Sequence, residues 1–147
     1  MLGFLVQFFC VEVSLSNYRK EWNMKFYKCE KCGKIIAIVQ ATAVPTICCG
    51  EGMKELVANE SDGAAEKHVP VAKTLSGKLV VEVGSAPHPM TDAHFIEWVA
   101  IETARGNQRV VLTSKDQPVA EFALLEGDRP LTVYAYCNLH GLWKADL

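Results

Sequence analysis

Four closely spaced cysteines constrain this chain more than any other feature of its sequence. They form a CxxC pair, Cys29 and Cys32, and an adjacent pair, Cys48 and Cys49. A tight CxxC turn directs two sulfurs toward one side, and Gly33 directly after it lets the backbone curl around an ion. The second pair completes a set of four sulfur ligands, which suits zinc or iron. Because the second pair has no spacer, we expect a strained backbone there and a distorted tetrahedral site.

The segment that carries these cysteines, residues 24–56, is too short to bury a core that is stable by itself, so a bound metal is expected to stabilise it. Residues 57–66 are small and polar and are interpreted as a linker. The apolar stretch MLGFLVQFFCVEVSL is shorter than the roughly 20 residues that span a bilayer, and it lacks the basic segment of a signal peptide. We interpret residues 1–23 as an N-terminal extension, and we assign no role to its Cys10.

The cysteine count also permits a different reading. Six cysteines in 147 residues fit a secreted disulfide framework. Four of them cluster, however, and the larger remainder holds only Cys137, so metal ligands in the reducing cytoplasm are favoured. A structural zinc site and a pair of disulfides stay open as alternatives for the cluster. The formal net charge of −2, from 15 basic and 17 acidic side chains, gives no electrostatic signature of a protein that binds nucleic acid or an anionic membrane.

The remainder of the chain, residues 67–147, predicts a second domain built from short strands. Apolar runs alternate with turn signals, which indicates an antiparallel β-sandwich of six or seven strands. The runs are KLVVEV, HFIEWVAIET, RVVLTS, VAEFALL and LTVYAYC. In the last run, Leu131, Val133, Ala135 and Cys137 alternate with Thr132 and two tyrosines, so a strand with one buried face is expected. The sequence shows no long amphipathic helix and no internal repeat.

The chain has four histidines, and each lies at a strand edge or in a turn: His68, His88, His94 and His140. The spacing of Cys137 and His140 is typical of two ligands across a tight turn. A β-sandwich can gather such loops at one end, and four imidazoles with one thiolate suit iron, copper or zinc. Five ligands exceed the usual four of zinc. They leave one position of an octahedron open, which favours iron.

These motifs resemble the two-iron superoxide reductases, also called desulfoferrodoxins. The matching pieces are YKCEKCGK and ICCGEGMKEL in the first domain, and EKHVPV, HPMTDAHFIEW and CNLHGLWK in the second. The resemblance runs from Met24 to the C-terminus. It implies a desulforedoxin-like or rubredoxin-like domain followed by an immunoglobulin-like β-sandwich. It also implies two iron ions per chain: an Fe(Cys)4 centre with ligands Cys29, Cys32, Cys48 and Cys49, and an Fe(His)4Cys centre with ligands His68, His88, His94, His140 and, axially, Cys137.

The resemblance further implies the reaction. Members of this family reduce superoxide by one electron to hydrogen peroxide, in superoxide detoxification, at a sixth coordination position opposite the thiolate. Glu66 and Lys67 match the family's loop glutamate and lysine. The glutamate is expected to occupy the open position in the oxidised state, and the lysine to attract superoxide and to organise a water that delivers a proton. A rubredoxin-like electron donor and a homodimer are implied as well.

Two other functions fit parts of the sequence. A rubredoxin-like electron carrier would use the β-domain only as a scaffold, and a zinc-stabilised binding module would have no redox role. Neither requires four histidines and a fifth cysteine in separate loops. A superoxide dismutase would also have to oxidise superoxide, and an axial thiolate suited to one-way reduction argues against that activity.

Overall fold

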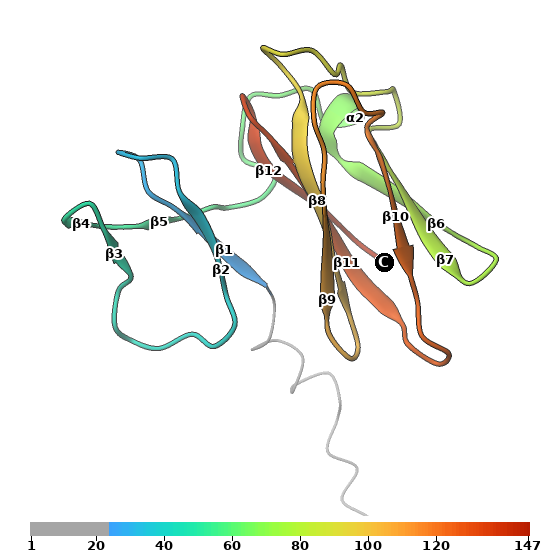
Figure 1. Cartoon of the computed structure of the whole chain (residues 1–147), viewed down its shortest axis with the longest axis horizontal. Helices are drawn as coiled ribbons and strands as arrows, with labels where there is room; N and C mark the ends of the chain where they lie inside the picture. The colour runs from blue at the N-terminus through green and yellow to red at the C-terminus, as the bar shows by residue number, and fades with distance from the viewer. Residues whose placement is uncertain (1–23) are drawn as a thin grey trace, which may run out of the picture.

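The computed structural model describes residues 24–147; the expected extension 1–23 and its Cys10 lie outside this range. Figure 1 shows two parts, a small one containing β1 to β5 and a larger sandwich containing β6 to β12. The small part has a three-stranded sheet of order β2-β1-β5 and a short β3-β4 ribbon. Its strands are β1 (Lys25–Lys28), β2 (Ile35–Ile38), β3 (Ile47–Cys48), β4 (Glu51–Gly52) and β5 (Lys54–Glu55).

The larger part begins with one helical turn and continues as seven strands, which confirms the predicted antiparallel β-sandwich. One sheet has the order β10-β7-β6 and the other has the order β12-β11-β8-β9. The elements are α2 (Ala65–His68), β6 (Pro70–Leu75), β7 (Lys78–Val83), β8 (Ile96–Thr103), β9 (Asn107–Val111), β10 (Val119–Ala123), β11 (Pro130–Cys137) and β12 (Gly141–Asp146). The core between the two sheets is built from alternating side chains of these strands, as in Leu79, Val81 and Val83 of β7.

Several strand limits differ from those predicted from the sequence. The predicted run RVVLTS starts at residue 109, but β9 already begins at Asn107, which pairs with Glu102. The run also ends earlier than expected, because Asp116 accepts hydrogen bonds from the backbone N–H and the hydroxyl of Thr113 and so closes a turn. Strand β6 was not among the predicted runs. At the end of β9, the hydrogen-bonded turn between Thr113 and Asp116 therefore outweighs the apolar pattern of the sequence.

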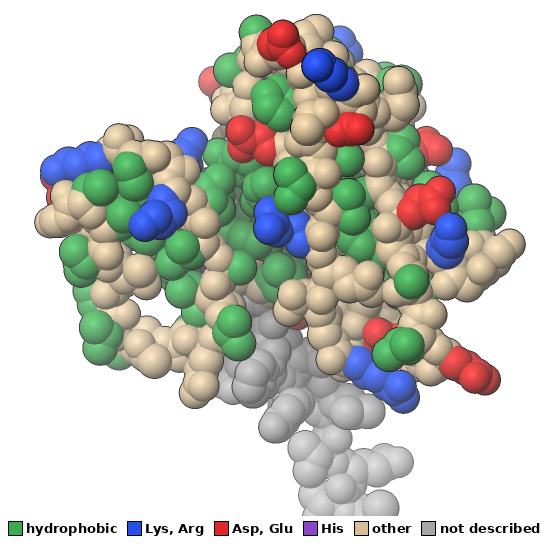
Figure 2. Space-filling model, viewed as in Figure 1, with side chains coloured by type: hydrophobic (Ala, Val, Ile, Leu, Met, Phe, Trp, Pro, Cys, Tyr) green, Lys and Arg blue, Asp and Glu red, His purple; other side chains and the backbone are tan. Residues whose placement is uncertain are grey.

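The prediction that β11 has one buried face is wrong, because both of its faces are buried. Val133 and Ala135 face the sandwich core, while Tyr134 and Tyr136 are 4% and 2% exposed on the opposite face. That opposite face forms a second apolar cluster with Phe26 of β1. Figure 2 shows hydrophobic side chains at the junction of the two lobes. The small domain therefore covers the outer face of the sheet, which alternation within one strand cannot reveal.

The connecting segment 57–66 is bonded to the sandwich. The backbone N–H of Asn59 donates to Leu142 O over 3.0 Å. The Asn59 side chain also accepts from Lys144 N over 2.8 Å and donates to Lys144 O over 3.2 Å. These bonds fix the segment along β12 before it reaches α2.

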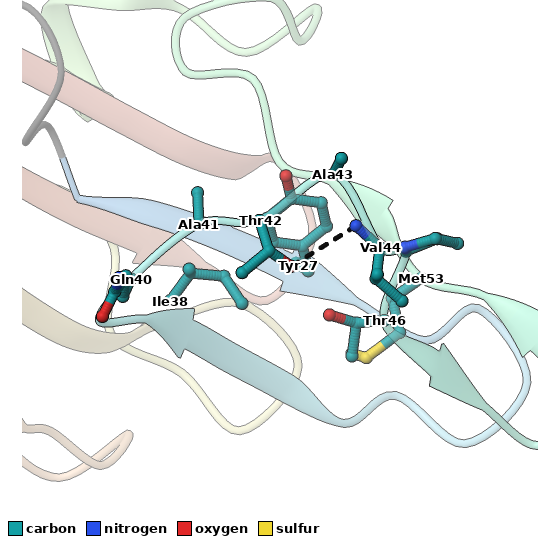
Figure 3. A pocket seen from close by; sticks show the side chains of 10 residues that line it. Tyr27, Ile38, Gln40, Ala41, Thr42, Ala43, Val44, Thr46 and Met53 are labelled. Atoms are coloured by element: carbon teal, nitrogen blue, oxygen red, sulfur yellow. Dashed lines mark hydrogen bonds between the residues drawn. The ribbon is translucent and has the colours of Figure 1, made fainter.

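A pocket of about 300 Å³ lies in the small domain beside β1 (Figure 3). No cysteine or histidine lines it, so it does not belong to either group of candidate metal ligands. Its lining residues are Tyr27, Ile38, Gln40, Ala41, Thr42, Ala43, Val44, Pro45, Thr46 and Met53. Across residues 24–147, no helix has the length and apolar character needed to cross a membrane.

Candidate metal centres

The four clustered cysteines converge in the small domain as predicted. One sulfur from each of Cys29, Cys32, Cys48 and Cys49 lies within 4.8 Å of all the others. The Sγ atoms of Cys32 and Cys48 are 3.7 Å apart, and those of Cys48 and Cys49 are 3.9 Å apart. Four sulfurs placed tetrahedrally about 2.3 Å from one ion lie about 3.8 Å from each other. The arrangement therefore fits a tetrahedral metal ion.

The backbone around this cluster contains the expected strain. Gly33 has a φ of 74° and donates its N–H to Cys29 O over 2.9 Å, which closes the CxxC turn. Cys49 has a φ of 51°, in the left-handed region that non-glycine residues rarely adopt. Such a conformation persists where the surroundings impose it, commonly at a functional site. At Cys49 it brings two adjacent sulfurs to one point, so the expected strained backbone of the CC pair is confirmed.

The protonation of these thiols also favours a cation. The backbone N–H of Cys32 lowers the pKa of the Cys29 thiol to about 7. In contrast, the neighbouring sulfurs of Cys32 and Cys48 raise the pKa of the Cys49 thiol to about 12. Once one thiol has lost its proton, its negative charge makes deprotonation of a second thiol unfavourable unless a cation lies between the two sulfurs. The described cysteines form no disulfide in residues 24–147, so the disulfide alternative for this cluster is wrong.

The histidines converge at one end of the sandwich. His68 ends α2, His88 and His94 lie in the loop between β7 and β8, and Cys137 ends β11 just before the turn that holds His140. These segments meet at the end where α2 lies, at the top of Figure 1. Donor atoms of His68, His88, His94 and Cys137 all lie within 4.8 Å of one another. Loops that are far apart in the sequence thus present nitrogen and sulfur donors to one point.

The four imidazoles form a square. Neighbouring ring centroids around it are 4.6, 4.6, 4.9 and 4.7 Å apart for the pairs His68–His88, His88–His94, His94–His140 and His140–His68. The planes of these neighbours are close to perpendicular, at 73–82°. Across the diagonal, His68 and His94 are 6.0 Å apart and only 27° from parallel. This arrangement would allow four imidazoles to hold one metal ion between them.

Hydrogen bonds define which nitrogens face inward. His68 Nδ1 donates to Ala64 O over 2.8 Å, and His88 Nδ1 donates to Pro89 O over 2.6 Å. Because a carbonyl only accepts, each Nδ1 carries the proton and each Nε2 presents a lone pair. The Nε2 atoms of His88 and His94 are buried, and no described residue hydrogen-bonds to them. Two orphaned buried nitrogens in this position fit a bound metal ion.

His140 contributes its other nitrogen. Its Nδ1 lies 3.0 Å from His68 Nε2 and 3.7 Å from the Cys137 sulfur. Two nitrogens about 2.1 Å from one ion and at right angles to it lie about 3.0 Å apart. His140 thus turns its Nδ1 toward the group, whereas His68 and His88 present Nε2, a distinction that residue spacing alone does not give.

Burial favours the neutral imidazoles that a metal requires. Removal from water lowers the pKa of His68 and of His94, and lowers that of His88 to about 4. Burial raises the pKa of the Cys137 thiol, while the backbone N–H groups of His140 and Leu139 oppose that rise. Burial therefore favours the neutral form of His68, His88 and His94, and a cation is needed to stabilise the Cys137 thiolate.

Two residues that sequence reasoning did not single out, Gly63 and Asn138, shape this site. A Cβ on Gly63 would lie 2.9 Å from Trp143 Cζ2 and 3.0 Å from His68 Cε1. Trp143 stacks on the His68 ring at 4.8 Å and donates its indole N–H to His140 O over 3.2 Å. The other is Asn138, which bonds to both neighbours of His94 in the chain. No periodic pattern marks either residue, because each acts through contacts that only the fold creates.

Glu66 and Lys67 lie within α2, directly before His68, and both side chains are exposed. Glu66 O accepts hydrogen bonds from Ala86 N over 2.9 Å and from the Ser85 hydroxyl over 3.2 Å. These bonds fix the turn against the loop that carries His88. Burial is the main cause of the lowered pKa of His68 and of His94, and the Lys67 ammonium adds a smaller effect in the same direction. Its charge therefore acts at the histidine cluster.

Comparison with known proteins agrees with this pair of sites. The family model for desulfoferrodoxin matches residues 60–146, and the model for the desulfoferrodoxin N-terminal domain matches residues 22–56. The chain belongs to the desulfoferrodoxin family. A desulfoferrodoxin from Syntrophotalea carbinolica is 42% identical over 84% of this chain and 96% of its own length. A superoxide reductase from Pyrococcus abyssi is 35% identical over 58% of this chain and 90% of its own length.

A solved structure shows the same architecture. The crystal structure of the superoxide reductase from Treponema pallidum aligns with a TM-score of 0.73 at 32% identity, covering 84% of this chain and 97% of that one. The alignment spans both the cysteine-rich domain and the sandwich, which confirms the predicted fold class. The four-cysteine group and the histidine–cysteine group match the two iron sites of the desulfoferrodoxin family, so the prediction of two iron sites per chain is also confirmed.

Proposed function

We propose that this desulfoferrodoxin is a superoxide reductase, which converts superoxide, one electron and two protons into hydrogen peroxide. The observation that carries the proposal is the square of four histidines with a buried cysteine beside it. We assign the ligands of this centre as His68, His88, His94, His140 and Cys137. A rubredoxin-like electron carrier would need only the four-cysteine centre.

Some residues of the centre would bind the metal, and others orient these ligands. These residues would hold an iron ion, which would supply the single electron for superoxide. The carbonyls of Ala64 and Pro89 fix the ring orientation of His68 and His88, so that both Nε2 lone pairs point inward. The Cys137 side chain is fully buried, which protects a reactive thiolate from solvent. Burial of the donors keeps the site fixed in shape, so that little reorganisation accompanies the reaction.

We assign Lys67 to the attraction of the superoxide anion, and Glu66 as the carboxylate that would bind the oxidised metal centre when no substrate is present. Both side chains are exposed on the α2 turn beside His68, where they can reach an incoming anion. An exposed cation next to a cationic centre raises the encounter rate of a small anion. The Lys67 ammonium also suits the ordering of a water that delivers a proton.

The four-cysteine centre is assigned to Cys29, Cys32, Cys48 and Cys49. Cys32 and Cys49 are exposed, which would allow an electron donor to approach their sulfurs. A rubredoxin-like protein is proposed as that donor, a second copy of the chain as the partner in a homodimer, and the cytoplasm as the location. The domains are proposed as 24–56 and 67–147, joined by residues 57–66 and preceded by the extension 1–23.

The decisive experiment mixes the reduced, iron-loaded protein with superoxide in a stopped-flow instrument and measures peroxide and oxygen. A superoxide reductase forms one hydrogen peroxide per electron and releases no oxygen. A dismutase would release oxygen, and an electron carrier would leave the reaction at the rate of uncatalysed decay. Either of these results would overturn the proposal.

A further inference from the structure

We propose that Asn138 is a positioning residue that holds His94 in register with Cys137. The inference rests on the proposed histidine–cysteine centre and adds a residue outside its ligand set. Asn138 directly follows Cys137 and lies beside the loop that carries His94. Its role is to join the two loops through its side-chain amide.

Three hydrogen bonds make this connection. The side-chain oxygen of Asn138 accepts from Phe95 N over 3.0 Å, and its amide nitrogen donates to Ala93 O over 3.0 Å. The backbone N–H of Asn138 donates to Phe95 O over 3.2 Å. Ala93 and Phe95 are the two neighbours of His94, so the Asn138 side chain is hydrogen-bonded to the backbone on both sides of that histidine. An amide group suits this task because it accepts and donates at the same time.

His94 needs such support more than the other histidines do. The rings of His68 and His88 are each anchored through Nδ1 to a carbonyl. The Trp143 indole donates to the carbonyl of His140. For the His94 ring, by contrast, residues 24–147 provide no hydrogen bond to its buried Nε2, whereas its backbone N–H and C=O are both bonded to Thr91. The position of the His94 ring therefore depends on its backbone.

The sheet does not supply this support by itself. The pairing of β11 with β8 changes register between Tyr136 and Cys137, so the regular ladder is interrupted just before the ligand. Beyond that irregularity the backbone N–H of Asn138 still bonds to Phe95 O, and the Asn138 side chain adds the bonds to Phe95 N and Ala93 O. It therefore connects the loop of His94 with the strand end that supplies Cys137.

The experiment compares iron binding by the full chain and by Asn138→Ala, using competition with a chelator and the thiolate absorption of the histidine centre. Loss of a group that orients a ligand typically weakens metal binding by about 10–100-fold. We expect a loss in that range at the histidine centre, a changed thiolate band, and an unaltered four-cysteine centre in the same molecule. Asn138→Asp keeps the acceptor for Phe95 N but sets a carboxylate oxygen against Ala93 O, so it should also weaken iron binding at the histidine centre, and it tests the inference if Asn138→Ala does not fold.

A matched control exists in the same chain. Asn59 makes the same pair of side-chain bonds, to the N–H and C=O of Lys144, and no metal ligand is involved. Asn59→Gly removes both bonds without placing a Cβ at its φ of 65°. It should lower thermal stability but leave the iron affinity and the thiolate band unchanged. Equal effects of the two substitutions on the metal centre would overturn the inference.

A double-mutant cycle separates this inference from the proposed function. If Asn138 acts through His94, then Asn138→Ala should have little further effect on iron affinity in a chain that already carries His94→Ala. If His94→Ala weakens iron binding and Asn138→Ala does not, the positioning role is wrong and the proposed centre stands. If His94→Ala itself has no effect on iron binding, the proposed centre is wrong.

Discussion

Lys28 donates a hydrogen bond from Nζ to the Tyr136 hydroxyl over 3.0 Å, and this bond joins the two iron-binding domains. Lys28 directly precedes Cys29 of the four-cysteine group, and Tyr136 directly precedes Cys137 of the histidine group. Tyr136 is also stacked on Trp98, with ring centroids 5.3 Å apart and planes 6° from parallel. The strand ends that carry one cysteine of each group are therefore fixed to one another.

Replacing Lys28 with Met should loosen this junction. The hydrogen bond to Tyr136 raises the pKa of Lys28 above its ordinary value of 10.5. The charged lysine therefore stabilises the folded protein fully at pH values below 10.5. This stabilisation is lost only when the pH rises through the raised pKa and the ammonium loses its proton. We therefore expect Lys28→Met to lower the free energy of unfolding by about 1 kcal/mol, and by the same amount at neutral and mildly alkaline pH. Urea denaturation at several pH values measures this.

The control for this prediction is Lys34→Met, which makes the same substitution at an exposed lysine of the small domain. It should have little effect on stability, because an exposed side chain away from such contacts contributes little. Tyr136→Phe removes the same bond from the other side and should not add to Lys28→Met in the double variant. Full additivity of the two would contradict a shared hydrogen bond.

The parts of the structure that depend on local patterns could be predicted from the sequence. The CxxC pair and its glycine indicate a metal-binding turn, because the short loop fixes the positions of both sulfurs independently of the tertiary fold. The alternation in KLVVEV predicts β7, since a strand that packs one face on a core must alternate. The approximate convergence of the histidines follows once a sandwich is assumed, because its loops gather at its ends.

Features that depend on how distant segments pack could not be predicted in this way. The burial of Tyr134 results from the docking of Phe26, and no pattern within β11 indicates that contact. The use of Nδ1 by His140 depends on the direction in which its turn presents the ring. The need for a glycine at position 63 arises from Trp143, which lies eighty residues later in the chain. Each of these features is a property of two segments together.

Gly63→Ala should damage the histidine centre. The added Cβ would lie 2.9 Å from the Trp143 ring and 3.0 Å from the His68 ring, closer than such atoms normally approach. Neither ring can move freely, because His68 is hydrogen-bonded to Ala64 and stacks on Trp143. We expect a loss of about 1–3 kcal/mol in the free energy of unfolding and a faster loss of iron to a chelator. Urea denaturation and iron analysis measure the two effects.

A matched control for this variant is Gly106→Ala. No heavy atom lies within 4 Å of the Cβ that this substitution would add. It should leave iron retention unchanged and alter stability much less than Gly63→Ala does. Iron retention that is the same in both variants would show that the close approach at Gly63 does not matter for the site.

Cys137→Ser should remove one of two absorption features from the iron-loaded protein. The Cys137 sulfur is the only thiolate donor in the described histidine group, so its band of thiolate-to-iron charge transfer is expected to disappear. The absorption of the four-cysteine centre should remain, because its ligands lie in the other domain. The reciprocal variant Cys32→Ser should alter the four-cysteine absorption and leave the band of the histidine centre. Persistence of both features in Cys137→Ser would refute the assignment of this cysteine.

Lys67→Ala should slow the second-order reaction with superoxide. Electrostatic steering of a small ion commonly raises its association rate by tenfold or more, so we expect a decrease of about tenfold at low ionic strength. The decrease should shrink as salt screens the charge, which flattens the dependence of the rate on ionic strength. Stopped-flow measurements over a series of salt concentrations test both effects. Lys78→Ala serves as the control, because it removes the same charge at the first residue of β7, and the β6–β7 hairpin points to the opposite end of the sandwich in Figure 1. If both variants slow the reaction equally, the overall charge of the protein steers superoxide and Lys67 has no special role.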